Sequence, residues 1–402
     1  MPIERFPLRH QPNIALDRGR AYGGEAAAIL NETGLAAAKR EIASWPDYRP
    51  TPLVALPGLA ARTGVGAVHY KDESQRFGLK SFKALGGAYA VLVILQDAVA
   101  ATGPRPSAAD LMAGEHRAIA GGVTVACATD GNHGRSVAWG AQMFGCRCVI
   151  YLHEHVSATR EREIARYGAE IRRVRGNYDM SVHQCAADAQ TNGWQLVADT
   201  SAGGSHRVPS LVMQGYTVMT DEILTALGTP PTHVFAPAAV GGLAAAIVGP
   251  LWERFGAARP RVIAVEPFQA DCVSLSLAQG HLTPATGDVE TFMACLAAGE
   301  VSPAAWPILG PALDDAIAIP DDAAVAAMSL LANGVDGDLP LVAGESGCAA
   351  TAGLIAATFD PAAKAALGLD AGSVVVVIGS EGATDADTYR AVVGRTAEEV
   401  AG

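Results

Sequence analysis

The stretch VTVACATDGNHGRSVAWGAQMFGCRCVIYL, residues 123–152, contains the strand–helix–strand unit that decides the fold. Residues 123–129 form a continuous apolar run rich in β-branched side chains, which is typical of a buried parallel strand. A glycine-containing turn follows, and residues 135–145 predict a helix that ends at Gly145. Residues 146–152 then repeat the strand pattern. Two strands joined through a helix in this way indicate a parallel sheet.

The same alternation continues along the chain. Residues 157–168 predict the next helix, with Ser157 as its N-cap. Buried-strand patterns return later, each near a helical run, at THVFAPA (232–238), RVIAVEP (261–267) and SVVVVIGS (373–380). Repeated units of this kind predict an α/β fold with mostly parallel sheets and helices on both faces.

Length and composition limit the class of protein. A chain of 402 residues is too long for one simple core, so we expect two domains. Half of the residues are apolar and 17% are charged, which indicates a well-buried globular protein. The net charge of −12 argues against binding to the phosphate backbone of nucleic acid. A small metabolite is therefore the favoured partner.

We expect a cytoplasmic protein that binds neither membranes nor metals. The N-terminal MPIERFPLRHQPN lacks the apolar run of a signal peptide, and no apolar stretch of membrane-spanning length is free of glycine, proline or charge. The seven cysteines are scattered. Cys146 and Cys148 form a CxC pair, but no second cysteine pair lies at the spacing of a zinc site. His153 and His155 flank Glu154, but alternate residues of a strand point to opposite faces, so this triplet predicts no metal site.

The stretch FGLKSFKALGG, residues 77–87, contains two lysines in apolar, glycine-rich surroundings. Ser81 is a candidate cap for a helix that Lys83 opens, whereas Lys80 precedes that cap and is expected to be more exposed. Burial disfavours the charged form of a lysine, so its pKa falls and the free amine becomes nucleophilic. Lys83 is therefore a candidate for a covalent bond to a carbonyl cofactor, and the alternative is a solvated surface charge.

Three further stretches follow predicted strands, where open parallel sheets bind their ligands. ATDGNHG (128–134) offers a carboxylate and an amide between glycines, and APAAVGGLAAA (236–246) brings small residues to a helix N-terminus, which can bind an anion. IGSEGATD (378–385) offers the hydroxyl of Ser380. Each stretch taken alone is also compatible with an ordinary strand–helix turn or a polar loop.

Together the four stretches resemble the fold type II pyridoxal-phosphate enzymes, the group of the serine and threonine dehydratases and the tryptophan synthase β subunit. The order matches: SFK, then GNHG, then a small-residue loop, then a late SEG. More narrowly, residues 40–395 resemble the diaminopropionate ammonia-lyases in stretches such as ATDGNHGR, VADT, MQGYTVMTDE and SEGATD. The resemblance implies a carbon–nitrogen lyase with pyridoxal 5'-phosphate as cofactor, a small amino acid as substrate and a homodimeric assembly.

The resemblance also implies a division of the chain. We expect two open, mostly parallel sheet domains with flanking helices. Residues 1–92 and 226–402 would form the large cofactor-binding domain and residues 93–225 the small one, with the active site in the cleft between them.

Catalytic roles follow from the same resemblance. Lys83 matches the Schiff-base lysine, which decides the choice against Lys80. Asp130 matches an acidic residue that acts as a base near the substrate, where ordinary serine dehydratases have serine, and Asp199 matches a second such acid. Either the freed lysine amine or Asp130 would remove the Cα proton, and the choice between them would determine which enantiomer reacts.

Binding roles are implied as well. Asn132 matches the residue that bonds the phenolic oxygen of the cofactor, and Ser380 matches the hydroxyl residue that faces its pyridine nitrogen. The expected cofactor-binding residues are Phe82, Lys83, Asn132, Ala238, Ala239, Val240, Gly241, Gly242, Leu243 and Ser380. The candidate substrate-binding residues are Thr129, Gly131, His133, Ser201, Arg207 and Glu345.

One stretch departs from the ammonia-lyase pattern. SAGGSHRVPS, residues 201–210, has small residues and then His206 and Arg207 where an aromatic and an acidic residue are expected. Arginine is a preferred partner for carboxylates, so a substrate with a second acidic group, such as 3-hydroxyaspartate, becomes an alternative. The other interpretation is that Arg207 is a surface charge and His206 a solvated loop residue.

The favoured hypothesis is β-elimination of a 2,3-diamino acid to pyruvate and ammonia. The first alternative is a dehydratase that acts on serine, threonine or 3-hydroxyaspartate. A nucleotide-binding oxidoreductase shares the α/β pattern but would need a GxGxxG fingerprint, which the sequence lacks. A binding protein without cofactor is disfavoured by Lys83, Asn132 and Ser380.

Overall fold

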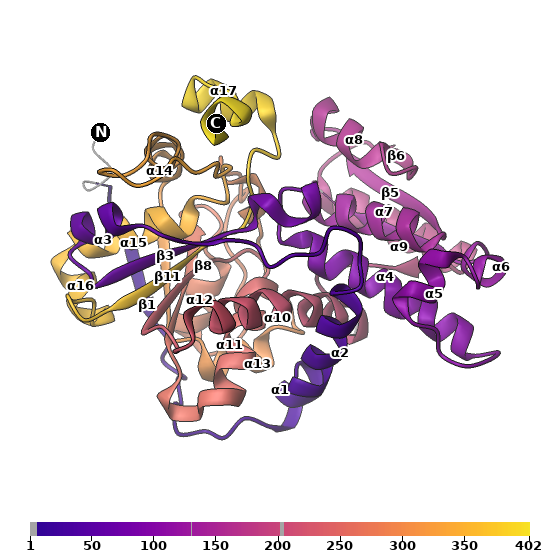
Figure 1. Ribbon diagram of the computed structural model, residues 1–402, viewed down its shortest axis with the longest axis horizontal. Coiled ribbons are helices and arrows are strands. Elements are labelled where there is room, and N and C mark those ends of the chain that lie inside the picture. The colour runs from indigo at the N-terminus through magenta and orange to yellow at the C-terminus, as the bar shows by residue number, and fades with distance from the viewer. Residues whose placement is uncertain (1–5, 130, 202–204) are drawn as a thin grey trace. The chain divides into compact units, whose positions relative to one another are not determined.

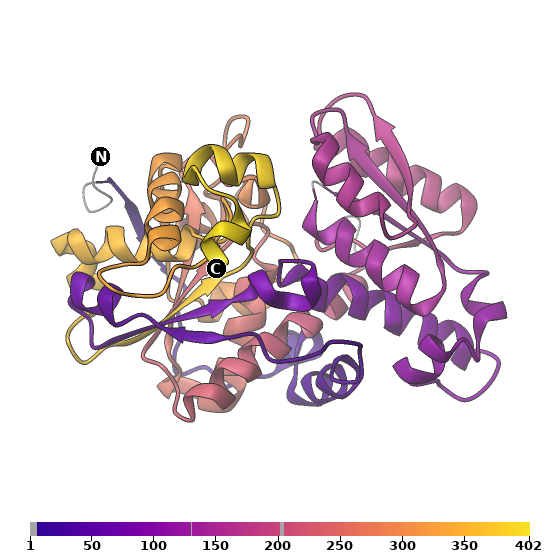
Figure 2. The same ribbon diagram turned by 45° about the horizontal axis from the view of Figure 1, so that its top comes forward.

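The computed structural model describes residues 6–129, 131–201 and 205–402. The predicted base Asp130 lies outside these residues. The chain forms two compact units: unit 1 comprises Met1–Asn31, Pro50–Ser81 and Met219–Gly402, and unit 2 comprises Glu32–Arg49 and Phe82–Val218. Figures 1 and 2 show the elements of each unit.

Unit 1 is built on a seven-stranded sheet in the order β1-β10-β9-β8-β11-β3-β2. The five inner strands are parallel to one another, and only the two edge strands, β1 and β2, run antiparallel to their neighbours. The strands are β1 (Arg9–Pro12), β2 (Leu53–Ala55), β3 (Ala67–Asp72), β8 (His233–Pro237), β9 (Arg261–Pro267), β10 (Asp315–Ile319) and β11 (Val374–Gly379). This arrangement confirms the mostly parallel sheet that the buried-strand patterns predicted.

Two separate groups of helices pack against this sheet, one on each face. α11 (Gly242–Phe255) packs against β8 and β9 and contacts α13 (Trp306–Ala312), whereas α15 (Ala349–Phe359) packs across β8 to β11 and contacts α14 (Asp321–Asn333). In Figure 1, α11 and α13 lie below the strands and α14 lies above them. Because both faces are covered, the inner strands can be apolar along their whole length. The other helices of unit 1 are α1 (Gly24–Ile29), α3 (Pro57–Thr63), α12 (Cys272–Gln279), α16 (Pro361–Leu367), α17 (Ala386–Val393) and α18 (Ala397–Ala401), with the 3-10 turns η2 (Glu73–Gly78), η3 (Gly256–Ala258) and η4 (Ala294–Leu296).

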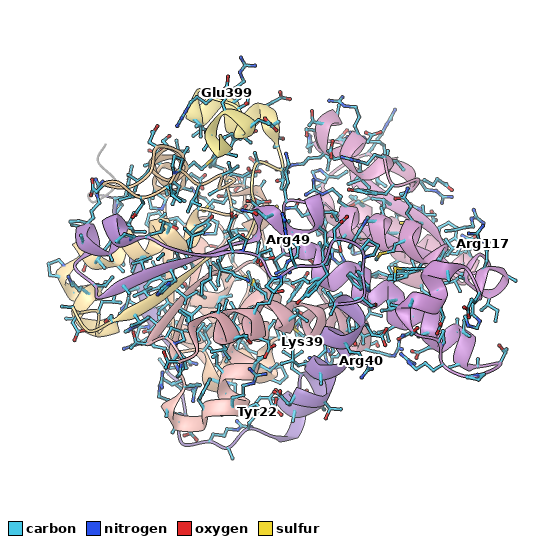
Figure 3. The ribbon with its side chains drawn as sticks, in the orientation of Figure 1. Tyr22, Lys39, Arg40, Arg49, Arg117 and Glu399 are labelled. Carbon is cyan, nitrogen blue, oxygen red and sulfur yellow. The ribbon has the colours of Figure 1, made fainter. Side chains whose placement is uncertain are left out.

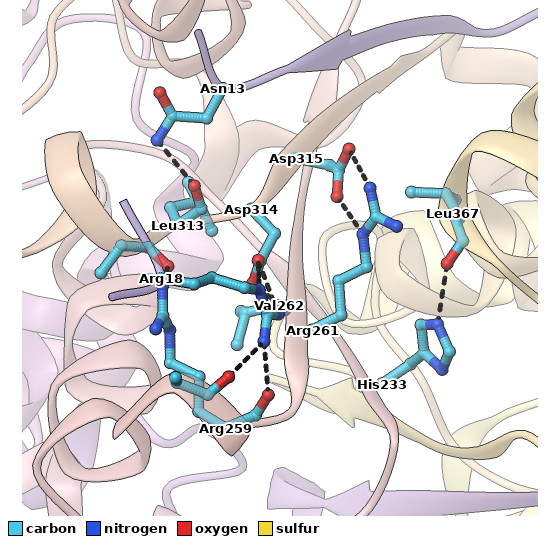
Figure 4. A network of polar contacts seen from close by, with 12 residues as sticks. Asn13, Arg18, His233, Arg259, Arg261, Val262, Leu313, Asp314, Asp315 and Leu367 are labelled. Atoms are coloured by element: carbon cyan, nitrogen blue, oxygen red, sulfur yellow. Dashed lines mark hydrogen bonds and ion pairs between the residues drawn. The ribbon is translucent and has the colours of Figure 1, made fainter. Parts of the chain in front are cut away.

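A polar network joins β9 and β10 at one end of the unit 1 sheet (Figure 4), and His10 of β1 adds a further contact to it. Asp315 accepts two hydrogen bonds from Arg261, at 2.6 and 3.0 Å, and His10 Nε2 lies 2.8 Å from the same carboxylate. The neighbouring Asp314 accepts a hydrogen bond from Arg18 at 2.7 Å. These paired charges satisfy aspartates that would otherwise be costly to bury.

Unit 2 contains a four-stranded parallel sheet in the order β6-β5-β4-β7. Its strands are β4 (Thr124–Ala128), β5 (Arg147–His153), β6 (Glu170–Val174) and β7 (Gln195–Leu196). Its helices are α2 (Glu32–Ile42), α4 (Lys83–Ala100), α5 (Ala108–Ala113), α6 (Arg117–Ala120), α7 (Asn132–Phe144), α8 (Ala158–Ala165), α9 (Tyr178–Asn192) and most of α10 (Arg207–Leu227). The outer faces of both units carry charged side chains, such as Arg117 and Glu399 in Figure 3.

Two caps predicted from the sequence are confirmed. α7 ends at Phe144 because Gly145 adopts the left-handed conformation (φ 80°), which is favourable for glycine. Ser157 caps α8 and accepts a hydrogen bond from the backbone N–H of Arg160. The helix predicted over 135–145 begins earlier, at Asn132, so the GNHG motif forms the first turn of α7.

The units divide at different residues from those predicted. The predicted division after residue 92 would cut α4, which is continuous from Lys83 to Ala100, and the chain instead passes between units at Ser81 and Phe82. The second division lies after Val218 rather than after residue 225, inside the long helix α10. Residues 32–49 belong to unit 2, because α2 packs against α4.

Among the described residues, one helix, α4, has the length and hydropathy to cross a membrane, and 78% of the qualifying window is buried inside the protein. Within unit 2, α7 packs closely along this helix, and α2 and α6 also contact it. A Cβ at Gly140 would lie 2.7 Å from the Cα of Ala88, and a Cβ at Gly87 would lie 2.6 Å from Ser136 Oγ, so glycine is needed at both contacts. Ser136 also accepts a hydrogen bond from the backbone N–H of Ala88 at 3.0 Å, which joins the N-terminal halves of α4 and α7.

Candidate active site

Lys83 is the first residue of α4, and its side chain is 17% exposed. Its Nζ donates a hydrogen bond to Asp199 Oδ2 at 2.6 Å. The predicted cap is wrong: the N-cap residue is Phe82, which makes no side-chain cap, and Ser81 instead forms a β-bridge with Glu381. Lys80 is partly buried as well, so burial does not distinguish the two lysines. Lys83 is distinguished by its ion pair with Asp199.

Asp199 follows β7 and remains ionised beside Lys83. Burial alone would raise its pKa, but the charge of Lys83 and the hydrogen bond from Lys83 outweigh burial and hold the pKa well below its usual range. Carboxylate and ammonium thus stabilise each other at neutral pH. The pair brings together two predicted catalytic residues that lie 116 positions apart in the chain.

His133, in the first turn of α7, is a neutral imidazole with a defined orientation. The side chain is buried, and its Nε2 lies 2.8 Å from the carbonyl oxygen of Val197, which can only accept. Burial lowers the pKa of His133 below its usual value, and Asp199 offsets this only in part. Nδ1 is consequently the unprotonated nitrogen, and it has no hydrogen-bond partner among the described residues. The ring presents a buried acceptor in the same cluster as Lys83 and Asp199.

The turn between β4 and α7 is held by Thr129. Its hydroxyl accepts hydrogen bonds from the backbone N–H groups of Gly131 (3.0 Å) and Gly134 (3.1 Å), and a Cβ at Gly134 would lie only 2.2 Å from Thr129 Cγ2. Asn132 is buried, and its Oδ1 accepts a hydrogen bond from Arg135 at 2.9 Å, which orients the amide. The structure thus places three predicted ligands, Thr129, Gly131 and Asn132, in one turn.

In unit 1, residues 238–241 connect β8 to the N-terminus of α11. Gly241 is the N-cap, with a left-handed φ of 87°, and a Cβ there would lie 2.7 Å from Leu309 Cδ1. The first backbone N–H groups of a helix have no acceptors within it, so this N-terminus can bind a phosphate. The predicted anion-binding loop therefore has the required backbone geometry.

Ser302 adds a polar group to this loop that the sequence did not reveal. Its backbone N–H donates to the carbonyl of Val240 at 2.8 Å, so the residue lies directly beside the loop. Its hydroxyl is buried and lacks a hydrogen-bond partner among the described residues. Buried hydroxyls are normally paired, so this group fits a site that is completed by a bound phosphate.

Ser380 and Glu345 are both buried residues of unit 1. Ser380 directly follows β11, as expected for a ligand at the carboxyl end of a parallel strand. Glu345 precedes α15, which begins at Ala349, and the adjacent Ser346 donates its backbone N–H to Glu381 at 3.2 Å. Their roles toward cofactor and substrate stay predictions.

The residues that depart from the ammonia-lyase pattern lie at the start of α10. Arg207 is the first residue of that helix, its side chain is 52% exposed, and it forms an ion pair with Asp97. His206 Nδ1 lies 3.2 Å from the hydroxyl of Ser201. This placement favours the interpretation of Arg207 as a surface charge over its role as a substrate ligand. Among the described residues, no group of three or more His, Cys, Asp or Glu side chains is arranged to hold a metal ion.

Tyr216 is a further member of the unit 2 site that sequence reasoning missed. Its ring centroid lies 5.8 Å from Lys83 Nζ and 4.7 Å from the ring centroid of Phe82, in edge-to-face contact. It is part of the MQGY stretch, in which the tyrosine carries no local signal of a functional role. Only the packing of α10 against α4 brings it to Lys83.

A cluster of buried charges supports the segment that precedes Lys83. Arg76 donates hydrogen bonds to Glu73 and to both carboxylate oxygens of Glu222, and Lys71 also pairs with Glu222 at 2.6 Å. Beyond Arg76, Phe77 adopts a left-handed conformation (φ 50°) that is unfavourable for residues with a side chain. The buried ion pairs of Arg76 fix the backbone directly before Phe77 and so offset the cost of its strained conformation.

Comparison with known proteins identifies the family of the chain. The model of the family described as "Pyridoxal-phosphate dependent enzyme" matches residues 45–381. The diaminopropionate ammonia-lyase of Escherichia coli strain K12 is 36% identical over 388 residues, which cover 94% of this chain and 96% of the relative.

Solved structures give the same result. The selenomethionine-containing holo diaminopropionate ammonia lyase from Escherichia coli matches with a TM-score of 0.87 and 35% identity, covering 96% of this chain and 97% of that chain. The same enzyme in complex with an aminoacrylate-PLP azomethine reaction intermediate matches with a TM-score of 0.84 and 34% identity, with the same coverage of both chains. The chain therefore belongs to the pyridoxal-phosphate dependent enzyme family and has the fold type II architecture that its motifs predicted.

Proposed function

We propose that the protein is an ammonia-lyase that converts 2,3-diaminopropionate to pyruvate and ammonia by β-elimination. The observation that carries the proposal is the Lys83–Asp199 pair at the start of α4, in a chain similar to diaminopropionate ammonia-lyases along nearly its whole length. When bound, the cofactor pyridoxal phosphate withdraws electrons from the Cα of an attached amino acid and so acidifies its Cα–H bond. The residues of the chain must then hold the amino acid and move its protons.

Lys83 supplies the amine that holds the cofactor. Asp199 orients that amine and stabilises it whenever it is protonated, because the carboxylate keeps its charge. Once released, the amine is free to take the Cα proton into a new N–H bond. Asp130 remains the second candidate base, and the two bases would act on opposite enantiomers.

The cofactor-binding residues are assigned from the chemistry of each group. Residues 238–243, at the N-terminus of α11, would hold the phosphate together with Ser302. Asn132 would bond the phenolic oxygen, since its amide is held by Arg135. Ser380 would face the pyridine nitrogen with a neutral hydroxyl.

His133 and Arg207 favour a diamino substrate over an acidic one. The unprotonated Nδ1 of His133 accepts hydrogen bonds, which suits an amino group of the substrate and does not suit a second carboxylate. The guanidinium of Arg207 is already paired with Asp97. These two contacts therefore disfavour 3-hydroxyaspartate, whereas serine and threonine, whose hydroxyl can also donate to Nδ1, are separated from diaminopropionate only by product analysis.

Product analysis tests the proposal. The holoenzyme is incubated with D- and L-2,3-diaminopropionate, and in parallel with serine, threonine and 3-hydroxyaspartate, and ammonia and 2-oxo acid are measured. We expect two ammonia molecules per pyruvate from diaminopropionate. Turnover of a hydroxy amino acid alone, with one ammonia per 2-oxo acid, would refute the proposal.

We further propose that the protein is a cytoplasmic homodimer, as expected from its resemblance to fold type II enzymes. Light scattering coupled to size-exclusion chromatography tests the assembly. A mass near twice 41.2 kDa supports the dimer, and a mass near 41.2 kDa contradicts it.

A further inference from the structure

Tyr216 has the features of a functional group. The residue is 1% exposed, and its hydroxyl has no hydrogen-bond partner of normal geometry among the described residues. Burial raises the pKa of this hydroxyl, and the Lys83 ammonium is the largest influence that lowers it again. A buried phenol normally has a hydrogen-bond partner, so we ask which group the hydroxyl of Tyr216 serves.

The position of the Tyr216 ring is enforced by glycines. A Cβ at Gly86 would lie 2.3 Å from Tyr216 Cε1, and a Cβ at Gly215 would lie 2.4 Å from the carbonyl oxygen of Leu85. α10 and α4 can therefore approach each other only because both positions lack a side chain. The edge-to-face contact with Phe82 fixes the ring from another side. The packing thus directs the tyrosine to the first turn of α4, where Lys83 lies.

Asp199 alone is an incomplete partner for a lysine that changes its protonation state. Its carboxylate can only accept hydrogen bonds, so it suits the ammonium form of Lys83. When Lys83 is a neutral amine, its lone pair needs a donor. A phenol can both accept from an ammonium and donate to an amine, so it can remain bonded in either state.

We propose that Tyr216 is a positioning residue for Lys83, whose hydroxyl holds the lysine amine between its departure from the cofactor and its return. This inference rests on the proposed function insofar as Lys83 carries the cofactor. It adds a residue to the reaction and depends on no particular substrate. The hydroxyl exchanges hydrogen bonds with the amine, and no covalent bond to Tyr216 forms.

The test is Tyr216→Phe in the holoenzyme, which removes the hydroxyl and keeps the ring. The first readout is the exchange of the cofactor between Lys83 and added glycine, followed by stopped-flow absorbance, because it requires no elimination. We expect the return to Lys83 to slow about tenfold, which corresponds to one hydrogen bond to a charged or strongly polar partner. The second readout is turnover of diaminopropionate, for which we expect kcat to fall about tenfold while KM stays within about twofold.

Tyr389→Phe is the matched control. Tyr389 lies in α17, is fully buried, and its hydroxyl also lacks a partner among the described residues, so the same atom is removed from a similar environment. We expect both rates to stay at the wild-type level. A third variant, Tyr216→Leu, removes the ring as well, and we expect it to lose at least as much as Tyr216→Phe.

Two results would overturn the proposal. The first is an unchanged exchange rate in Tyr216→Phe; if Tyr216→Leu then loses rate, the effect belongs to the ring alone. The second is a loss in Tyr389→Phe equal to that in Tyr216→Phe. Absence of diaminopropionate turnover in the wild-type enzyme would refute the proposed function, yet leave the glycine exchange able to test Tyr216.

Discussion

Two lysine–carboxylate pairs in this protein have the same length but different surroundings. Lys71 Nζ lies 2.6 Å from Glu222 in unit 1, and Lys83 Nζ lies 2.6 Å from Asp199 in unit 2. The first pair is nearly inaccessible, with side chains 1% and 3% exposed, whereas the second pair is 17% and 19% exposed. Distance alone therefore does not distinguish a structural ion pair from a reactive one.

The partners around each pair make the difference. Lys71 also donates to the carbonyl of Thr51 at 2.9 Å, and Glu222 receives further hydrogen bonds from Arg76. These contacts are fixed and mutual, as a buried ion pair requires if it is to offset its desolvation. Near Lys83 lie two groups that belong to no fixed network: the imidazole Nδ1 of His133, which has no partner among the described residues, and the hydroxyl of Tyr216, which interacts with Lys83 itself. Buried groups of this kind are costly to the folded protein, and they are retained where a ligand or a reacting group completes them.

The largest expected effect is on chemistry at Lys83. Lys83→Ala should lower turnover by at least about a thousandfold, because no other amine in the described site can replace the covalent attachment. The measurement is steady-state formation of 2-oxo acid by protein whose fold is verified by circular dichroism. Lys80→Ala, three residues away, is the control and should retain turnover within about tenfold. Comparable losses in both variants would mean that the segment is sensitive as a whole.

The next effect concerns stability, which should depend much more on the Lys71–Glu222 pair than on the Lys83–Asp199 pair. Glu222→Gln leaves Lys71 and Arg76 without one buried countercharge, so the free energy of unfolding should fall by about 3–5 kcal/mol. Asp199→Asn, in the more accessible pair, should lower stability by less than Glu222→Gln does, because solvent partly screens this pair, but it should lower turnover about a hundredfold. Denaturant unfolding and initial rates on both variants check this. Equal stability losses would contradict the distinction between the pairs.

A smaller effect is expected at the phosphate-binding loop. Ser302→Ala should weaken cofactor binding about fivefold to tenfold, since it removes one hydrogen bond to an anion. Equilibrium dialysis of pyridoxal phosphate gives the affinity directly. Thr351→Val removes another buried hydroxyl without a partner in the described chain, in α15, and should leave the affinity unchanged. An unchanged affinity in Ser302→Ala would exclude this serine from the phosphate site.

The smallest effect is on the pH dependence of stability. The pKa of His133 is lowered in the folded protein, so below the ordinary value of 6.5 the unfolded chain binds a proton that the folded chain does not. Stability should therefore decrease as the pH falls through 6.5, by about 1 kcal/mol or less from this residue. His133→Gln should remove that part of the slope in unfolding experiments between pH 5 and 7. A steeper slope in the variant would contradict a neutral His133.

The parts of the fold that depend on short stretches were predictable. The β4–α7–β5 unit, the cap at Gly145 and the placement of Lys83 at a helix start all rest on patterns read along continuous stretches of the chain. The division into units was wrong because α4 and α10 are continuous helices, and a helical pattern gives no sign of where one unit ends.

The parts that depend on distant residues were not predictable from local patterns. Tyr216 reaches Lys83 through helix packing, and Ser302 reaches Val240 through a backbone hydrogen bond across 62 positions. The resemblance implied that Asp199 is an acidic residue near the substrate, but its pairing with Lys83, 116 positions away, was not predicted. Arg207 pairs with Asp97, 110 positions away, so its sequence neighbours could not reveal this partner.

We propose Lys83 as the reactive lysine, rather than Lys71, whose ion pair has the same length, or the nearby Lys80. The most direct test is reduction of the holoenzyme with borohydride, which fixes the cofactor to its lysine, followed by peptide mass spectrometry. The account predicts the cofactor mass on Lys83 alone. A label on Lys71, Lys80 or any other lysine would contradict it.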